Sequence, residues 1–343
     1  MHGLMHTGRC GRKKKELHFR RNFHGFSSPF KPKVNSMCRR PFLLSRSILT
    51  LLLLHSLECL GQTPDSSFSA QGRLFHFSLS SAPFPHPKRA EGHKYRDSLY
   101  SASEHYRDST VAVFVPKGFR RTAATDFVIY FHGWSNCVDT ALRYYRLVDQ
   151  FTESKKNAIL VLPEGPRYAP DSFGGKLEDK DGFKRFMSDV VRQLVKAKIV
   201  HTKQIGRIIL AGHSGGYHVM SYILLRGGMN KHIKEVYLFD AWYGQTEKFS
   251  YWLDHFRGKV ITIYTDQGGT KDETETIMED LDGWRIPYVN IQDTLATQRM
   301  LRRHRLVFLH TGLVHNDVVH VRNSFCEYLK ASLLASRNDV RKK

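Results

Sequence analysis

The sequence predicts an α/β protein with a doubly wound, mostly parallel sheet flanked by helices. Short apolar, β-branched runs recur along the chain and alternate with segments of helical spacing, which is the pattern of repeated strand–helix units. Several runs are apolar at every position, as strands buried on both faces are. The clearest is Phe-Val-Ile-Tyr-Phe at 127–131. In open sheets of this kind, ligands bind at the carboxyl ends of the strands.

The expected elements follow in order along the chain. Residues 62–108 are rich in Ser, His, Pro and charge, and we expect an irregular lead-in with edge strands such as 73–79. Apolar residues three and four apart predict a helix over 183–195. Further helices are expected over 217–225 and around 318–334. The other expected strands lie at 110–115, 127–131, 158–162, 208–210, 236–239, 260–264 and 306–309.

The most informative segment is 207–216, Arg-Ile-Ile-Leu-Ala-Gly-His-Ser-Gly-Gly. A strand signal runs directly into a G-x-S-x-G pattern, and a helix signal follows. In that context the motif indicates a nucleophile elbow, a sharp turn that exposes the serine hydroxyl at the sheet edge. Ser214 is therefore the candidate nucleophile, and the amide of Gly215 is a candidate oxyanion donor. The alternative is a glycine-rich turn with a capping serine.

Two further motifs match one known family. His132-Gly133 ends an early central strand, and Leu-Val-His-Asn-Asp stands at 313–317, after the last strand. With the elbow, these make the chain resemble the α/β-hydrolase superfamily of serine esterases, lipases and peptidases over about 109–335. The resemblance implies that the backbone of Gly133 or Trp134 supplies the second oxyanion donor. His132 itself is then expected only to order its loop.

The resemblance also places the base. A serine hydroxyl needs a base that titrates near neutral pH, usually histidine. The superfamily carries this histidine in the loop after the last strand, which is the position of His315. The implied chain order is serine, acid, histidine. His310, at the strand end, and His320, further along, are expected to be structural.

The acid that holds the histidine has two candidates. Asp240 and Asp266 each end a strand between Ser214 and His315. The superfamily more often uses the later strand, which slightly favours Asp266, while Asp240 has the position used by some lipases. Either aspartate could instead serve a turn. Asp317 is expected to be a first-turn residue of the last helix.

Other segments are open to two interpretations. The polar stretch 164–182 is long for a connection in a compact domain, so it is either a lid or binding loop or a surface excursion. Trp134, Trp242 and Tyr243 either line a pocket or pack in the core. The five cysteines form no C-x-x-C pair, and neither a Walker loop nor a dinucleotide fingerprint is found. We therefore expect a mechanism without metal or cofactor.

The amino-terminal part has a different character. Residues 1–46 hold twelve Lys or Arg and one acid, Glu16. Residues 37–61 have the charged and apolar regions of a signal peptide, with an apolar stretch too short for an ordinary membrane span. We therefore interpret 1–36 as a basic leader or a mis-assigned start, 37–61 as a signal peptide, and 109–343 as the catalytic domain. Cleavage would leave Gln62 first, and lipidation at Cys59 is an alternative.

These observations predict an exported serine hydrolase, secreted, periplasmic or on the cell surface, that cleaves a carboxylic ester through an acyl-enzyme on Ser214. The alternatives are a peptidase or amidase on the same fold and a non-catalytic, hydrolase-like binding lipoprotein. The partner is a small-molecule or peptide acyl substrate. Membrane contact would come only through the leader or Cys59, and nucleic acid binding by the basic arm is the least favoured interpretation. After cleavage Cys137 and Cys326 remain, and the sequence does not decide whether they pair.

Overall fold

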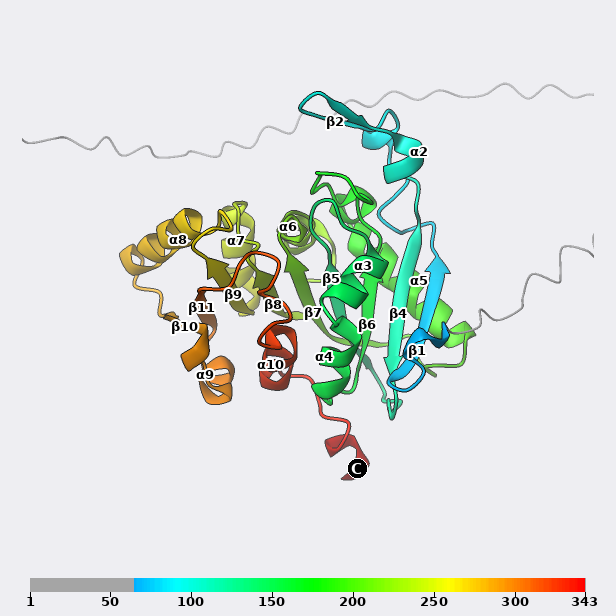
Figure 1. Cartoon of the computed structure of the whole chain (residues 1–343). Coiled ribbons are helices and arrows are strands. Elements are labelled where there is room, and N and C mark those ends of the chain that lie inside the picture. The colour runs from blue at the N-terminus through cyan, green and yellow to red at the C-terminus, as the bar shows by residue number, and fades with distance from the viewer. Residues whose placement is uncertain (1–64, 343) are drawn as a thin grey trace, which may run out of the picture. The chain divides into compact units, whose positions relative to one another are not determined.

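The structure, a computed structural model, describes residues 65–342. The expected signal peptide and basic leader lie outside these residues. The described chain forms a nine-stranded sheet in the order β1-β4-β6-β5-β7-β8-β9-β11-β10 (Figure 1). Its strands are β1 (Gly72–Ser78), β4 (Thr110–Pro116), β5 (Thr125–Phe131), β6 (Ala158–Pro163), β7 (Ile205–His213), β8 (Ile233–Phe239), β9 (Lys259–Thr265), β10 (Val289–Gln292) and β11 (Leu306–Thr311).

Most of this sheet is parallel. Strands β5 to β11 all pair in parallel, whereas β4 is antiparallel to both of its neighbours, β1 and β6. The strand order turns back on itself around β5, so crossover connections run to both faces of the sheet. The predicted doubly wound, mostly parallel sheet is confirmed. The edge strand expected at 73–79 corresponds to β1.

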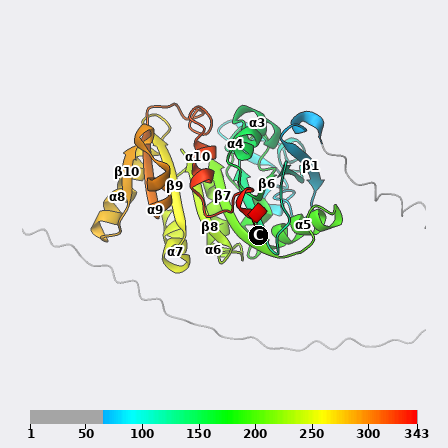
Figure 2. The same cartoon turned by 90° about the horizontal axis from the view of Figure 1, so that it is seen from below.

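Helices cover both faces of the sheet, as the view from below shows (Figure 2). One apolar core lies between the sheet and α5, α6, α7 and α8, and a second lies between the sheet and α3, α4, α9 and α10. The helices are α2 (Ala102–His105), α3 (Val138–Tyr144), α4 (Leu147–Glu153), α5 (Gly182–Lys196), α6 (Gly216–Arg226), α7 (Thr246–Phe256), α8 (Lys271–Gly283), α9 (Gln298–Arg303) and α10 (Ser324–Ala331). The 3₁₀ turns are η2 (Ser66–Phe68), η3 (Pro87–Arg89), η4 (Gly175–Glu178), η5 (Asp293–Leu295) and η6 (Asp339–Lys342).

The central strands explain why the sequence is apolar at every position there. Along β5, Phe127, Ile129 and Phe131 enter one core while Val128 and Tyr130 enter the other. Successive side chains of a strand point to opposite faces, so a strand between two helical layers buries both sets. All five side chains are at most 5% exposed.

A small hairpin lies above one end of the sheet. It consists of β2 (His93–Tyr95) and β3 (Ser98–Tyr100), and it is followed by the single-turn helix α2 (Figure 1). The ring of Tyr95 stands edge-on to Trp134, with centroids 5.4 Å apart. Since Trp134 follows β5, the hairpin belongs to the carboxyl edge of the parallel strands.

Two expectations need correction. The last helix is shorter than the expected 318–334, because residues 312–323 form a series of turns before α10 begins. These turns carry His315 back toward the sheet edge. Strand β10 was not expected from the sequence, because it is short and its side chains alternate between half-buried and exposed. No helix within 65–342 is long and apolar enough to cross a membrane.

Candidate active site

Ser214 occupies a strained turn between β7 and α6. Its φ is +52°, a left-handed conformation that costs energy for a residue with a side chain. Its amide donates to the carbonyl of Phe239, at 3.2 Å, at the end of the neighbouring strand β8. The turn is possible because α6 approaches the sheet closely: a Cβ on Gly216 would lie 2.8 Å from the carbonyl oxygen of Phe131. The strand, turn and helix expected of a nucleophile elbow are therefore present.

His315 and Asp240 lie beside this elbow and are joined to each other. Nδ1 of His315 is 2.6 Å from Oδ2 of Asp240. Asp240 directly follows β8, and its side chain is fully buried. A buried carboxylate at this distance accepts the Nδ1 proton and leaves Nε2 free to act as a base.

Asp240 is held as an anion by hydrogen bonds. Its oxygens accept from the hydroxyl of Thr265 at 2.9 Å, from the amide of Thr265 at 3.3 Å and from the hydroxyl of Thr270. Burial alone would raise the pKa of this carboxyl, but the hydrogen bonds from His315, Thr270 and Thr265 outweigh it and lower the pKa below its usual value. The group that faces His315 is thus a charged acceptor.

Asp266, slightly favoured from the sequence, has other partners in this structure. Asp266 lies at the end of β9, where its Oδ1 is 2.8 Å from Nζ of Lys271 and 3.0 Å from Nε2 of His310. Its side chain is 48% exposed. Asp266 therefore pairs with the strand-end histidine and a surface lysine, and not with His315. His310 also contacts the amide nitrogen of Gln292 through Nδ1, at 2.8 Å.

His320 and Asp317, also considered from the sequence, lie outside the pair formed by His315 and Asp240. His320 packs its ring against Tyr144, with centroids 5.1 Å apart, and its buried Nδ1 has no hydrogen-bond partner in the described chain. Asp317 is in a turn, where its amide donates to the carbonyl of Val314 at 2.9 Å. Asp317 is not in the final helix, which begins only at Ser324.

Gly133, Trp134 and Gly215 lie beside Ser214. Gly133 lies against the nucleophile, since a Cβ on it would be 2.7 Å from Cβ and 3.3 Å from Oγ of Ser214. Gly215 is the N-cap of α6, so its amide lies at the positive end of that helix. Within residues 65–342, the amides of Gly133, Trp134 and Gly215 donate to no protein acceptor. These amides are therefore free to serve as the oxyanion donors expected from the sequence, Gly215 first and Gly133 or Trp134 second.

His132 orders the loop that carries these donors. Its Nδ1 is 2.8 Å from the carbonyl oxygen of Gly133, and its Nε2 is 3.0 Å from Oε1 of Glu164. Burial disfavours the charged ring, but the hydrogen bond and the charge of Glu164 prevail and raise the pKa of His132. Both oxygens of Glu164 also lie 3.2 Å from the amide of Val138, the first residue of α3. The sequence motif did not indicate Glu164, which joins β6, the oxyanion loop and α3.

The stretch 164–182 brings one polar side chain to the mouth of the site. Nε1 of Trp134 donates to Oγ of Ser172 at 2.6 Å, and a Cβ on Gly215 would lie 2.6 Å from the same oxygen. The stretch is anchored by Asp171, which forms two hydrogen bonds with Arg89 at 2.7 and 3.0 Å. It contacts the site, as a binding loop would.

Trp242, Trp134 and Tyr243 lie in three different environments. Trp242 is 2% exposed and stacks on Phe308, so it belongs to the core. Trp134 is 45% exposed at the mouth of the site. The ring of Tyr243 lies edge-on to that of His315, with centroids 6.4 Å apart, and its hydroxyl donates to the carbonyl of Gly268.

The ring of His315 contacts that of His213, the residue before Ser214, with centroids 4.5 Å apart. Within the described chain no hydrogen bond joins Oγ of Ser214 to the imidazole of His315. Such bonds are often long in the absence of substrate and shorten when it binds.

A small cavity lies beside the elbow. Its volume is about 20 Å³, which accommodates roughly one water-sized group. Most of its lining is apolar, and it shares His132, Gly215 and Gly216 with the region around Ser214. Its other lining residues are Pro83, Phe131, Pro163, Gly165, Pro166, Asp171, Ser172, Phe173, Gly174, Leu177 and Val219.

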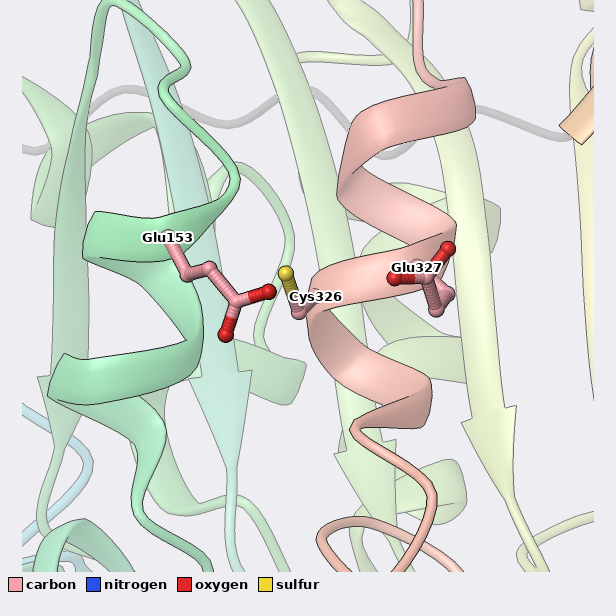
Figure 3. Close-up of side chains that lie close together, drawn as sticks. All are labelled: Glu153, Cys326 and Glu327. Atoms are coloured by element: carbon pink, nitrogen blue, oxygen red, sulfur yellow. The ribbon is translucent and has the colours of Figure 1, made fainter.

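One cluster of potential metal ligands lies far from this edge. Glu153 of α4 faces Cys326 and Glu327 of α10 (Figure 3). Nζ of Lys330 is 2.9 Å from a carboxylate oxygen of each glutamate. The Lys330 ammonium forms an ion pair with each carboxylate, so the cluster links the two helices. Cys326 and Cys137 are both buried free thiols and do not pair.

The strand order, the antiparallel second strand, the elbow after β7 and the histidine after β11 together define the architecture. The fold is that of the α/β-hydrolases. No protein-family model matches the sequence, and no curated protein matches it.

Solved structures do resemble the chain, at low sequence identity. A mutant of the feruloyl esterase module from Clostridium thermocellum, complexed with sinapinate, is 12% identical, with a TM-score of 0.48 over 79% of this chain and 93% of that one. The S-formylglutathione hydrolase FrmB from Staphylococcus aureus is 12% identical, with a TM-score of 0.43 over 79% of this chain and 100% of that one. The fluorophosphonate-binding serine hydrolase FphF from the same organism is 10% identical, with a TM-score of 0.45 over 76% and 99%.

Proposed function

We propose that this protein is a serine hydrolase that cleaves a carboxylic ester through an acyl-enzyme on Ser214. The observation that carries the proposal is the 2.6 Å contact between His315 and a fully buried Asp240, directly beside a serine in a strained elbow. A nucleophile, a base and a group that orients the base are the parts that acyl transfer requires.

Each part has a defined step. His315 takes the hydroxyl proton of Ser214 at Nε2 while Oγ attacks the acyl carbon. The negative charge that develops on the carbonyl oxygen is held by the amide of Gly215 and by that of Gly133 or Trp134. His315 then gives the proton to the departing alkoxide, which leaves as an alcohol. Water, deprotonated by His315, releases the acid and restores Ser214.

The small cavity supports a short acyl group. It adjoins Gly215, the amide proposed to hold the oxyanion, so a substituent on the acyl carbon can reach it. Its volume of about 20 Å³ leaves room for a group about the size of a water molecule, which favours a small acyl substituent there. We therefore expect acetyl esters to be better substrates than long-chain esters. An ester is preferred over an amide because an alkoxide is the better leaving group.

Chromogenic substrates test this proposal. The wild-type protein should hydrolyse p-nitrophenyl acetate, and kcat/KM should fall by about tenfold or more for p-nitrophenyl octanoate. N-acetyl p-nitroanilides should react far more slowly. Ser214→Ala should remove the activity while the melting temperature stays close to that of the wild type. Activity that survives in Ser214→Ala, or faster cleavage of the anilide, would contradict the proposal.

Export is a separate part of the proposal. It rests on the sequence of residues 37–61, where Arg39-Arg40 precede an apolar run that ends in Leu51-Leu52-Leu53-Leu54. The mature protein should begin near Gln62 or at a lipidated Cys59. Amino-terminal sequencing of the abundant cellular form tests this, and a protein that begins at Met1 would refute it. In that case salt-dependent binding of nucleic acid by the basic arm should be measured.

A further inference from the structure

His213 precedes the candidate nucleophile and points to the other side of the elbow. Its side chain is buried, and both ring nitrogens have partners. Nε2 lies 3.0 Å from the backbone carbonyl oxygen of His315, and Nδ1 lies 3.0 Å from the hydroxyl of Tyr145. A carbonyl oxygen can only accept, so Nε2 carries the proton. Nδ1 is then an acceptor, and the Tyr145 hydroxyl donates to it.

The same ring contacts the imidazole of His315. The two ring centroids are 4.5 Å apart, with the planes tilted by 40°. The ring of Tyr145 packs against His213, with its centroid 5.1 Å from that of His213. His213 therefore touches His315 twice, at its main-chain carbonyl and at its ring. The second polar contact of His315 is the bond from Nδ1 to Asp240.

The loop around His315 is exposed near the histidine and anchored further along, where Val318 and Val319 are fully buried and Gln150 donates to the carbonyl of Val319. Val314 is 54% exposed, and the loop forms turns from 312 to 323. The hydrogen bond from His213 ties this loop to the end of β7, the strand that also carries Ser214. One short segment thus sets the positions of both groups that exchange a proton.

His213 is suited to this place because it stays uncharged. Burial and the nearby charge of His315 lower the pKa of His213 to about 3. The charged and titratable groups around the pair are Asp240 at the end of β8, Tyr145 at the end of α3, and Tyr243 after β8. A second cation 4.5 Å from His315 would oppose the imidazolium that forms during the reaction.

We propose that His213 is a positioning residue: its Nε2–H holds the carbonyl of His315, and Tyr145 fixes the tautomer that makes this possible. The inference rests on the proposed function of Ser214 and His315. It predicts that loss of this donor changes the rate of proton transfer and leaves substrate binding nearly intact.

Two substitutions at the same position test the inference. Glutamine places an N–H where Nε2 stands, whereas phenylalanine keeps the ring and removes the donor. His213→Phe should lower kcat by about 10- to 100-fold with KM within about threefold, because a misplacement of 1 Å can cost about 10² in rate. His213→Gln should retain kcat within about fivefold. His320→Gln is the matched control. His320 lies in the loop that carries His315, and its Nδ1 has no partner in the described chain.

A second measurement does not depend on turnover. In a ¹⁵N-histidine NMR spectrum of the wild-type protein, His213 should show the Nε2-protonated neutral form and should not titrate between pH 5 and 8. A titrating or Nδ1-protonated His213 in an active enzyme would overturn the inference alone. So would equal kcat values for His213→Phe and His213→Gln. Absence of ester hydrolysis in a protein with the expected His213 spectrum would overturn only the proposed function.

Discussion

Replacing Asp240 with asparagine is the sharpest test of how the candidate base is oriented. The carboxylate is fully buried and accepts the Nδ1 proton of His315 at 2.6 Å. An asparagine has nearly the same shape, but its amide can donate to Nδ1. The proton of His315 would then move to Nε2, which could no longer accept the proton of Ser214.

The expected loss is large and falls on catalysis. The corresponding change in serine proteases lowers kcat by about 10⁴, which equals about 5 kcal/mol at about 1.36 kcal/mol per tenfold. The side chain also accepts from Thr265 and Thr270, so stability will fall as well. Breaking such a buried bond costs about 1–3 kcal/mol. This is too little to unfold a protein of ordinary stability.

Asp266→Asn is the matched control, because Asp266 is also an aspartate at a strand end but is half-exposed and pairs with Lys271 and His310. The assay compares kcat for p-nitrophenyl acetate and the melting temperature of both variants. Asp240→Asn should lose about four orders of magnitude in kcat, and Asp266→Asn should stay within about threefold of the wild type. Near-normal turnover in Asp240→Asn would refute the assignment of the acid.

Two further predictions concern residues beside Ser214. Gly133→Ala should lower kcat by tenfold or more, because the new Cβ would lie 2.7 Å from Cβ of Ser214. Gly283→Ala is the control and should keep kcat, because a Cβ there meets nothing within 4 Å. Similar kinetics for the two variants would contradict the close approach of Gly133 to Ser214. In the folded protein His213 is neutral, with a pKa of about 3, whereas in the unfolded chain it protonates near pH 6.5. Acid therefore favours the unfolded state of the wild type, which should lose about 2 kcal/mol more stability than His213→Gln between pH 7 and pH 5. Urea unfolding at both pH values measures this, and identical losses would show that the ring is not buried in its neutral form.

The central strands could be predicted from the sequence because their burial leaves a local mark. Residues 127–131 are apolar at every position, and the chain there forms β5 as expected. Strand β10 leaves no such mark, since its side chains alternate between half-buried and exposed. The elbow was predictable for a different reason: a sharp turn around Ser214 requires small neighbours, and glycines are visible in any sequence.

The acid could not be predicted, because Asp240 and Asp266 have the same local signature. Each follows an apolar strand, and the sequence holds no local signal that separates them. What separates them is tertiary: Thr265, the last residue of β9, and Thr270, in the connection that follows, donate to Asp240. Asp266 is left at the exposed end of β9. Superfamily frequency favoured the later strand because it carries no information about these neighbours.

The partners of His132 and His213 were hidden for the same reason. Glu164 follows a proline at the end of β6 and has no motif around it, yet it contacts His132 at the end of the neighbouring strand β5. Tyr145 is one aromatic residue among many and lies 68 positions before His213. A histidine that precedes the serine of a G-x-S-x-G motif is a signal that could have drawn attention to His213.

Active-site labelling tests the central claim most directly. A fluorophosphonate reacts with an activated serine and forms a stable adduct, so mass spectrometry of the intact protein and its peptides reports both stoichiometry and position. The account predicts one adduct per chain, on Ser214, no adduct in folded Ser214→Ala, and labelling slowed by orders of magnitude in Asp240→Asn. An unlabelled wild-type protein, or a label that persists in Ser214→Ala, would contradict it.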